Sequence, residues 1–151
     1  MAERFFAFEF SGRLLAVEMI HSRELMAYPA VASVPQSPDW LLGVTHIRGE
    51  LIPVFSLHPF VGTSPPSPQN MTRLLVLNDG DWSLGIPVTQ AFAVDTEASE
   101  WAPHPQTESW AALQRERVTE AGSISWLSLS SLRQQIETDL HFQLPVFEKA
   151  A

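Results

Sequence analysis

The chain has 151 residues, of which 45% are hydrophobic and 17% charged, and its formal net charge is −8 at pH 7. We expect a single globular domain over residues 1–151, because this length can bury a substantial core. Cysteine is absent, which excludes disulfides and thiolate zinc sites, and the eight arginines and one lysine are scattered, which argues against nucleic acid and anionic membrane surfaces as partners.

The predicted elements are mostly short strands joined by turns. Apolar residues alternate with others in "FFAFEF" and again in "RLLAVEMI", and residues 11–12 supply the turn between them. Three further strand pairs have turns at residues 48–49, 78–81 and 121–122. Four hairpins without a long amphipathic helix between them predict an all-β fold whose strand edges are hidden in barrels or a sandwich.

Two irregular, proline-containing stretches interrupt this pattern, at residues 62–70 and 98–110. The first is predicted to be an exposed loop. It divides the chain into a front half and a back half of about four strands each. This division suits two small barrels that share one core.

Helices are predicted to be few and short. "SPDWLL" and "SLHPFVG" could each form a single turn. Near the C-terminus, Leu132, Ile136 and Leu140 lie at helical spacing, and Ser131 with Gln134 has the form of a capping box. We therefore expect a C-terminal helix that begins at about Leu132.

The sequence carries no recognisable catalytic or metal-binding motif. Its five histidines are dispersed, and no pair has the spacing of a metalloprotease. A nucleophile elbow and a glycine-rich phosphate loop are also missing, so we expect neither an enzyme nor a bound metal or cofactor. A Ser-His-Asp arrangement assembled in three dimensions stays open, because such triads are recognised by geometry and not by order.

Two tryptophans, Trp101 and Trp110, lie in the second irregular stretch. They could form an aromatic platform that binds a peptide or small ligand, since tryptophan is enriched at interface hot spots. The favoured interpretation is that they fix this loop to the body of the fold. The platform is the basis of an alternative function, a free-standing SH3-like binding module.

Arg48 interrupts an apolar segment, "GVTHIRGELIPVFSL". A buried and unpaired guanidinium costs several kcal/mol, so Arg48 must project into solvent or be paired. Projection is easy at a hairpin tip, where Gly49 follows. An exposed arginine on a rigid turn is well placed to recognise a protein partner.

The segment "VPQSPDWLLGVTHIRGELIPVFSL" (34–57) resembles the CheW-like domain of bacterial chemosensory coupling proteins. The matching positions are Val34, Pro35, Pro38, Gly43, Val44, Arg48, Gly49, Pro53, Val54 and Leu57. Looser agreement extends over roughly residues 5–133, where "SREL" (22–25) resembles the end of the family's second strand.

The resemblance implies two intertwined, five-stranded SH3-like barrels with a shared core, short helical turns and a C-terminal helix. It also implies a non-catalytic, cytoplasmic adaptor without direct membrane insertion. Such an adaptor couples the signalling tip of a methyl-accepting chemoreceptor to the regulatory domain of a CheA-type histidine kinase.

The resemblance places a receptor-facing groove at Ser22, Glu24, Gly43, Arg48 and Gly49. The two glycines would permit close backbone approach by the receptor. Arg48 would pair with a receptor carboxylate, and Glu24 would pair with a receptor cation.

Four positions depart from the family pattern. His46 stands where the family usually has asparagine, and Ser56, Thr89 and Ser128 stand where it usually has aspartate. Hydroxyl groups can still cap turns and helices, so we expect the fold to be kept. The departures suggest a specialised branch, such as one that serves a type IV pilus, and they leave partner specificity open.

Overall fold

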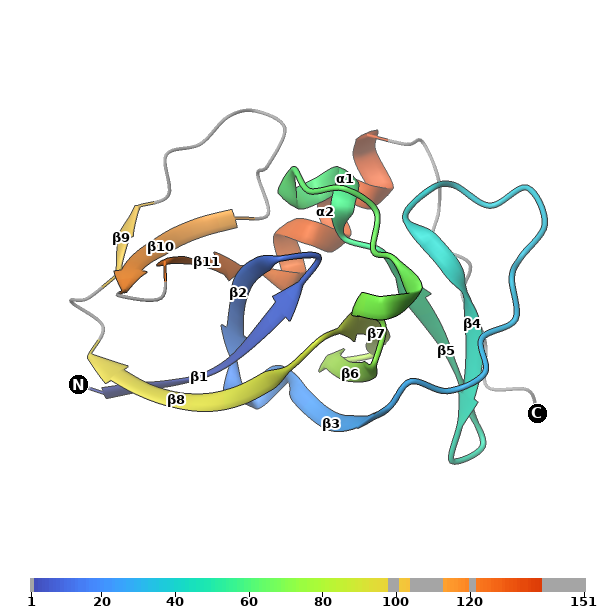
Figure 1. Cartoon of the computed structure of the whole chain (residues 1–151), viewed down its shortest axis with the longest axis horizontal. Helices are drawn as coiled ribbons and strands as arrows, with labels where there is room; N and C mark the ends of the chain where they lie inside the picture. Colours follow the sequence, from blue (N-terminus) through green and yellow to red (C-terminus); the bar gives the residue numbers. More distant parts are fainter. Residues whose placement is uncertain (1, 98–100, 104–112, 120–121, 140–151) are drawn as a thin grey trace.

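The structure is a computed structural model, and it describes residues 2–97, 101–103, 113–119 and 122–139. Most of these residues lie in two β-sheets (Figure 1), so the prediction of an all-β fold is confirmed. The terminal sheet has the strand order β8 (Ala91–Glu97), β1 (Ala2–Phe10), β2 (Arg13–Glu18), β11 (Gly122–Leu127), β10 (Leu113–Thr119) and β9 (Ala102–Pro103). The central sheet has the order β3 (Ser22–Ala27), β6 (Arg73–Asp79), β7 (Trp82–Val88), β5 (Glu50–Phe55) and β4 (Leu41–Ile47).

All four predicted hairpins are present. Strands β1 and β2, β4 and β5, β6 and β7, and β10 and β11 each pair antiparallel with their neighbour in the chain. Each hairpin is specified locally, by period-two apolar residues on both sides of a turn. Alternating apolar residues around a turn are therefore sufficient to predict these four hairpins.

The chain changes sheet between β2 and β3, which the sequence analysis missed. "RLLAVEMI" was expected to be one strand, but β2 ends at Glu18 and a 3-10 turn, η1 (Met19–His21), follows it. Residues 22–25 then open β3 in the central sheet instead of ending the second strand. The apolar side chain of Ile20 made residues 19–21 resemble a continuation of the strand, but Ile20 is exposed to solvent in the turn.

The two sheets do not correspond to the two halves of the chain. Strands β6 and β7 follow the 62–70 loop, yet they pair with β3 and β5, which precede it. Two parallel pairings, β2 with β11 and β5 with β7, join segments that are distant in sequence. The expectation of one barrel per half is therefore wrong, whereas the intertwined arrangement implied by the resemblance is confirmed.

One hydrophobic core joins the two sheets. Its buried side chains include Phe8 and Leu15 from the terminal sheet and Leu75 and Ile86 from the central sheet. Burying these chains against one another removes apolar area from water on both sheets at once. The core is shared, as predicted.

Helices play a minor part in the fold. The single turn expected in "SLHPFVG" is α1 (His58–Val61), and a second 3-10 turn, η2, spans Pro68–Asn70. The C-terminal helix α2 spans Leu129–Asp139 and packs against the shared core, so the predicted helix is present. Within the described ranges, the helices are all too short or too polar to cross a bilayer.

The predicted cap of α2 is wrong. The helix begins three residues before Leu132, and the backbone N–H of Ser131 donates to the hydroxyl of Ser128 at 3.3 Å. Ser128 is thus the N-cap, which satisfies one of the N–H groups that a helix start leaves without an intrahelical partner. Leu129 is buried in the shared core, and this tertiary contact draws the helix start forward.

Candidate protein-binding site

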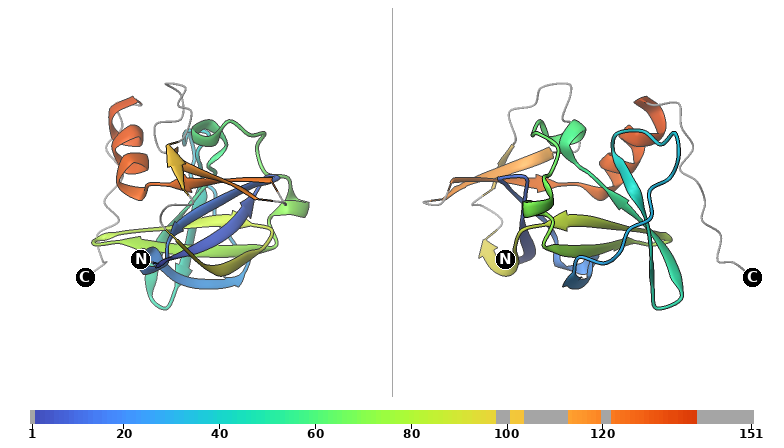
Figure 2. Two further views of the ribbon diagram at one scale, coloured as in Figure 1. Left: turned by 90° about the vertical axis from the view of Figure 1, so that its left-hand side faces the viewer. Right: turned by 45° about the vertical axis from the view of Figure 1, so that its right-hand side comes forward.

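The Arg48-Gly49 turn lies at the tip of the β4–β5 hairpin, which projects from one side of the molecule (Figure 2). Arg48 has φ +51° and Gly49 has φ +79°. Positive φ at both central residues is the signature of a type I′ turn, whose twist matches that of the flanking strands. The side chain of Arg48 is 74% exposed, so it projects into solvent as the sequence predicted.

Arg48 is also paired. One of its guanidinium nitrogens lies 2.9 Å from a carboxylate oxygen of Glu24, on β3. A second ion pair lies beside it, because Arg23 on β3 contacts Glu50 on β5 at 2.7 Å. The structure therefore brings Glu24 and Arg48 together, and it adds Arg23 and Glu50, which the sequence did not single out.

These two ion pairs show that the central sheet is strongly curved. Strand β3 lies at one edge of this sheet, and the β4–β5 hairpin lies at the other. In a flat sheet the two would be about 14 to 19 Å apart, at about 4.8 Å per strand. Contacts of 2.7 and 2.9 Å therefore require the sheet to curl toward a closed barrel, which places β3 beside the hairpin tip.

The two glycines of the predicted groove have different structural roles. Gly43 has φ +153°, and a Cβ atom at this position would lie 2.3 Å from the carbonyl oxygen of Ala32. The close approach at Gly43 is thus made by the chain itself, whose Ala32 forms a bridge with Val44. A Cβ atom at Gly49 would meet nothing within 4 Å, so this glycine is needed for its backbone conformation.

Ser22 lies at the start of β3 and shapes the preceding turn. Its hydroxyl donates to the carbonyl oxygen of Met19 at 2.8 Å, and its backbone N–H donates to the same oxygen. Ser22 therefore fixes η1 in place, and it is half-buried.

The four departures from the family pattern are accommodated locally. His46 is exposed on β4. Ser56 is fully buried and hydrogen-bonds to Nδ1 of His58 at 2.5 Å, while the hydroxyl of Thr89 donates to the carbonyl of Asn70. Together with the Ser128 cap, these bonds satisfy the three hydroxyls without a carboxylate, as expected for a preserved fold.

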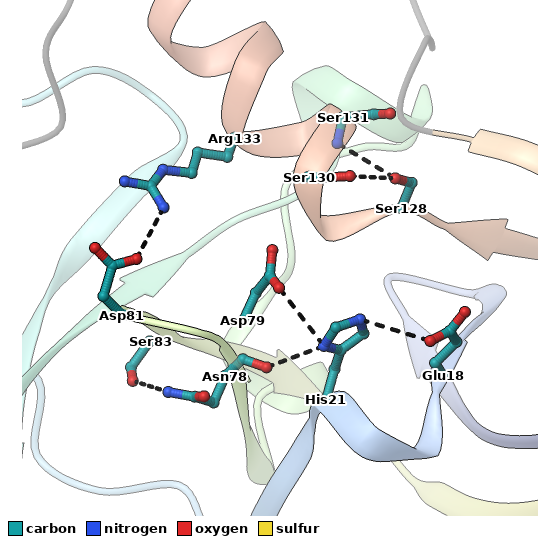
Figure 3. Close-up of polar contacts among 10 residues, drawn as sticks. All are labelled: Glu18, His21, Asn78, Asp79, Asp81, Ser83, Ser128, Ser130, Ser131 and Arg133. Carbon is teal, nitrogen blue, oxygen red and sulfur yellow. Dashed lines mark hydrogen bonds and ion pairs between the residues drawn. The ribbon is translucent and has the colours of Figure 1, made fainter.

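A polar cleft of about 250 Å³ lies where the two sheets meet (Figure 3). It is lined by Glu18, His21, Asp79, Trp126, Leu127, Ser128, Leu129 and Ser130. The Nδ1 atom of His21 lies 3.1 Å from the carbonyl oxygen of Asn78 and 4.0 Å from a carboxylate oxygen of Asp79. Its Nε2 atom lies 3.9 Å from a carboxylate oxygen of Glu18. Sequence reasoning missed this cluster, because only the i, i+3 spacing of Glu18 and His21 hinted at it.

This cleft is poorly suited to metal binding or nucleophilic catalysis. Glu18 and Asp79 face opposite nitrogens of the His21 ring, so the three groups do not converge on one ion, and no cluster of metal-ligating side chains occurs in the described part of the chain. The Ser128 hydroxyl serves the helix cap. The Ser56–His58 pair is equally unsuited to catalysis, because Ser56 is inaccessible to a substrate.

Trp101 packs into the fold instead of forming an exposed platform. Its ring lies edge-on against Phe5 and Trp126, with centroids 5.2 and 5.1 Å apart, and it is buried. Trp101 is therefore packed into the body of the fold, whereas most of the stretch that carries it lies outside the described residues. Trp110 lies outside the described residues.

Comparisons with known proteins identify the family to which the chain is similar. The family model described as the CheW-like domain matches residues 4–109. Protein PilI of Pseudomonas aeruginosa is 29% identical over 64% of this chain and 57% of its own length, so the chain spans little more than half of that relative. Chemotaxis protein CheW of Klebsiella aerogenes is 25% identical over 82% of this chain and 74% of its own length.

A solved structure supports the fold. The scaffolding protein TtCheW of Thermoanaerobacter tengcongensis superposes with a TM-score of 0.74 and 18% identity, covering 85% of this chain and 90% of that one. The fold, two intertwined β-sheets that share one core, is therefore the fold of that scaffolding protein. The chain belongs to the CheW-like domain family. This membership also confirms the prediction that the chain is not an enzyme.

Proposed function

We propose that this chain is a cytoplasmic adaptor that couples a methyl-accepting chemoreceptor to a CheA-type histidine kinase. In this proposal one domain over residues 1–151 binds the receptor's signalling tip and the kinase's regulatory domain. The observation that carries the proposal is the CheW-like family match, which includes the Arg48-Gly49 hairpin. Relatives named PilI and FrzA, the latter from Myxococcus xanthus, favour a pathway that controls pilus-based or surface motility.

The proposed receptor surface comprises Ser22, Glu24, Gly43, Arg48 and Gly49. Within it, Arg48 and Glu24 neutralise each other in the free chain. A receptor carboxylate can approach Arg48 from solvent, because most of its side chain is exposed, and a guanidinium can serve two carboxylates at once. Gly43 contributes indirectly, by letting Ala32 pack against β4.

The test is calorimetric binding of the purified chain to a receptor signalling tip and to a kinase regulatory domain. Replacement of Arg48 by Glu places a carboxylate beside Glu24, and it should weaken receptor binding about tenfold to a hundredfold. Arg73→Glu is the matched control, because Arg73 is an exposed arginine on β6 outside the proposed surface. The absence of binding to either partner would refute the proposal.

The alternative, a module that binds a peptide through Trp101 and Trp110, lacks structural support in the described part of the chain. The ring of Trp101 is occupied by Phe5 and Trp126. A ligand could reach this ring only after the packing had opened. We therefore carry the adaptor function forward alone.

A further inference from the structure

One side of the β4–β5 hairpin is open to solvent near its tip. His46 and Leu51 lie opposite each other on the two strands, and both are exposed. Because side chains alternate between the two faces of a strand, Thr45, Ile47 and Ile52 point the other way, and all three are buried. We call the exposed side, made of His46 and Leu51, the outer face of the hairpin.

The inner side of the hairpin is already occupied. Ile47 belongs to a buried cluster of the central sheet, and Glu50, which lies opposite Ile47, pairs with Arg23 on β3. At the tip, Arg48 is held to the same strand by Glu24. The hairpin projects from the molecule (Figure 2), so a partner can reach its tip and its outer face from solvent.

The outer face carries an apolar group and a polar group that the fold itself leaves available. Leu51 is 36% exposed, and it is the only exposed large hydrophobic side chain of the hairpin, which the structure describes throughout. The ring of His46 makes no hydrogen bond or ion pair with any residue that the structure describes. The other three positions that depart from the family pattern carry hydroxyls that are hydrogen-bonded within the fold. His46 is therefore the departure that can act on a partner directly.

The position of the outer face determines which partner covers it. His46 and Leu51 lie within three residues of Arg48, and cross-strand neighbours have Cβ atoms about 4.5 to 5.5 Å apart. A stable interface covers about 800 Å² on each partner, which is much wider than a hairpin tip. A protein that binds Arg48 therefore also covers the outer face, and it leaves no room there for a second protein.

We propose that the outer face extends the receptor surface, and that His46 and Leu51 select the segment of the signalling tip that binds. This proposal rests on the adaptor function and deepens it. The selected segment carries an apolar side chain that packs against Leu51, next to a hydrogen-bond acceptor that receives an N–H of His46. An imidazole ring supplies at least one such donor whether it is neutral or protonated.

Calorimetric titration of single variants with the receptor signalling tip tests the proposal. Leu51→Thr should weaken receptor binding about fivefold to tenfold, because it removes apolar area from the interface. Leu51→Ile is the matched control and should bind within about twofold of the unaltered chain, since isoleucine is also β-branched but keeps the apolar area. His46→Ala should weaken receptor binding about fivefold, because one hydrogen bond is lost.

Two further measurements serve as controls. Each of these variants should bind the kinase regulatory domain as tightly as the unaltered chain does, which also shows that the variants are folded. Phe92 on β8 is another exposed apolar residue, and it lies outside the hairpin. Phe92→Thr should therefore bind the receptor signalling tip within about twofold of the unaltered chain.

The outcomes separate this inference from the adaptor function. If Leu51→Thr and His46→Ala bind the receptor as tightly as the unaltered chain while Arg48→Glu binds it more weakly, the inference fails and the adaptor function stands. Equal losses of affinity for the receptor and the kinase domain would overturn the assignment of the outer face to the receptor. If the unaltered chain binds neither partner, both proposals fail.

Discussion

At the scale of single residues, Arg48 shows how a charge can be both exposed and satisfied. Its placement at a turn, followed by Gly49, was predicted from the sequence, because turn chemistry is local. Its partner Glu24 was not predicted, because the pair forms only when the central sheet curls. An exposed pair of this kind contributes about 0.2 to 1 kcal/mol, so its value to the protein lies in positioning more than in stability.

The two glycines of the site predict a contrast in stability. Gly43→Ala should destabilise the fold by about 3 kcal/mol or more, because the added Cβ atom meets the backbone of Ala32. The Cβ atom that Gly49→Ala adds meets no other atom within 4 Å. This variant should therefore lose only about 1 to 2 kcal/mol of stability, because alanine is less stable than glycine in the left-handed conformation. Urea denaturation of both variants measures the difference, and equal losses would show that contact with Ala32 is not the constraint at Gly43.

We expect the stability of the folded chain to depend on the ionisation of Tyr28 at alkaline pH. Burial raises the pKa of the Tyr28 hydroxyl above its ordinary value of 10.0, because the folded chain disfavours the charged phenolate. Its contribution to stability is therefore complete below pH 10 and is lost as the pH rises above that value. Tyr28 is the only tyrosine, so tyrosinate absorbance reports it directly. A midpoint in the folded chain at or below that of the urea-unfolded chain would contradict this prediction.

At the scale of elements, the sequence predicted the four hairpins well and the helix start poorly. Hairpins depend on alternation and turn residues, which lie within about a dozen positions of each other. The start of α2 depends on a choice among Ser128, Ser130 and Ser131, all of which are acceptable N-caps. Burial of Leu129 in the shared core decides between them, and this contact cannot be seen in a local pattern.

The cap assignment is testable by substitution. Ser128→Ala should destabilise the chain by about 1 kcal/mol, because the backbone N–H of Ser131 loses its acceptor. Gln134→Ala serves as the control, since Gln134 would form half of the capping box predicted from sequence, and alanine is a good helix former. Thermal unfolding followed by circular dichroism measures both. A larger loss of stability for Gln134→Ala than for Ser128→Ala would instead support the capping box of Ser131 and Gln134.

At the scale of the whole molecule, sheet order was beyond the reach of sequence patterns. The parallel pairings of β2 with β11 and β5 with β7 join residues that no local signal connects. No local pattern predicts that the chain changes sheet at η1, because Met19 and Ile20 are apolar residues of the kind found in strands. The resemblance to a known family supplied the intertwined arrangement, which composition and periodicity could not.

The shared core predicts that both sheets unfold together. Side chains from the two sheets and from α2 belong to one buried cluster, and the parallel pairings cross-link distant segments. Tryptophan fluorescence and far-ultraviolet circular dichroism should therefore give coincident urea transitions. The tryptophans that the structure describes lie in two separate clusters, with Trp82 in the shared core and Trp126 in a second cluster. Two resolved transitions would show that the sheets are independent.

The central claim, that this chain couples a receptor to a kinase, is tested most directly by co-sedimentation. A receptor signalling tip, a kinase regulatory domain and this chain are mixed, and the boundary of the kinase domain is followed with and without the chain. We predict that the kinase domain sediments with the receptor only when the chain is present, and that Arg48→Glu, which weakens receptor binding, reduces the fraction of the kinase domain that sediments with the receptor. Sedimentation of the kinase domain that is the same with and without the chain would contradict the account.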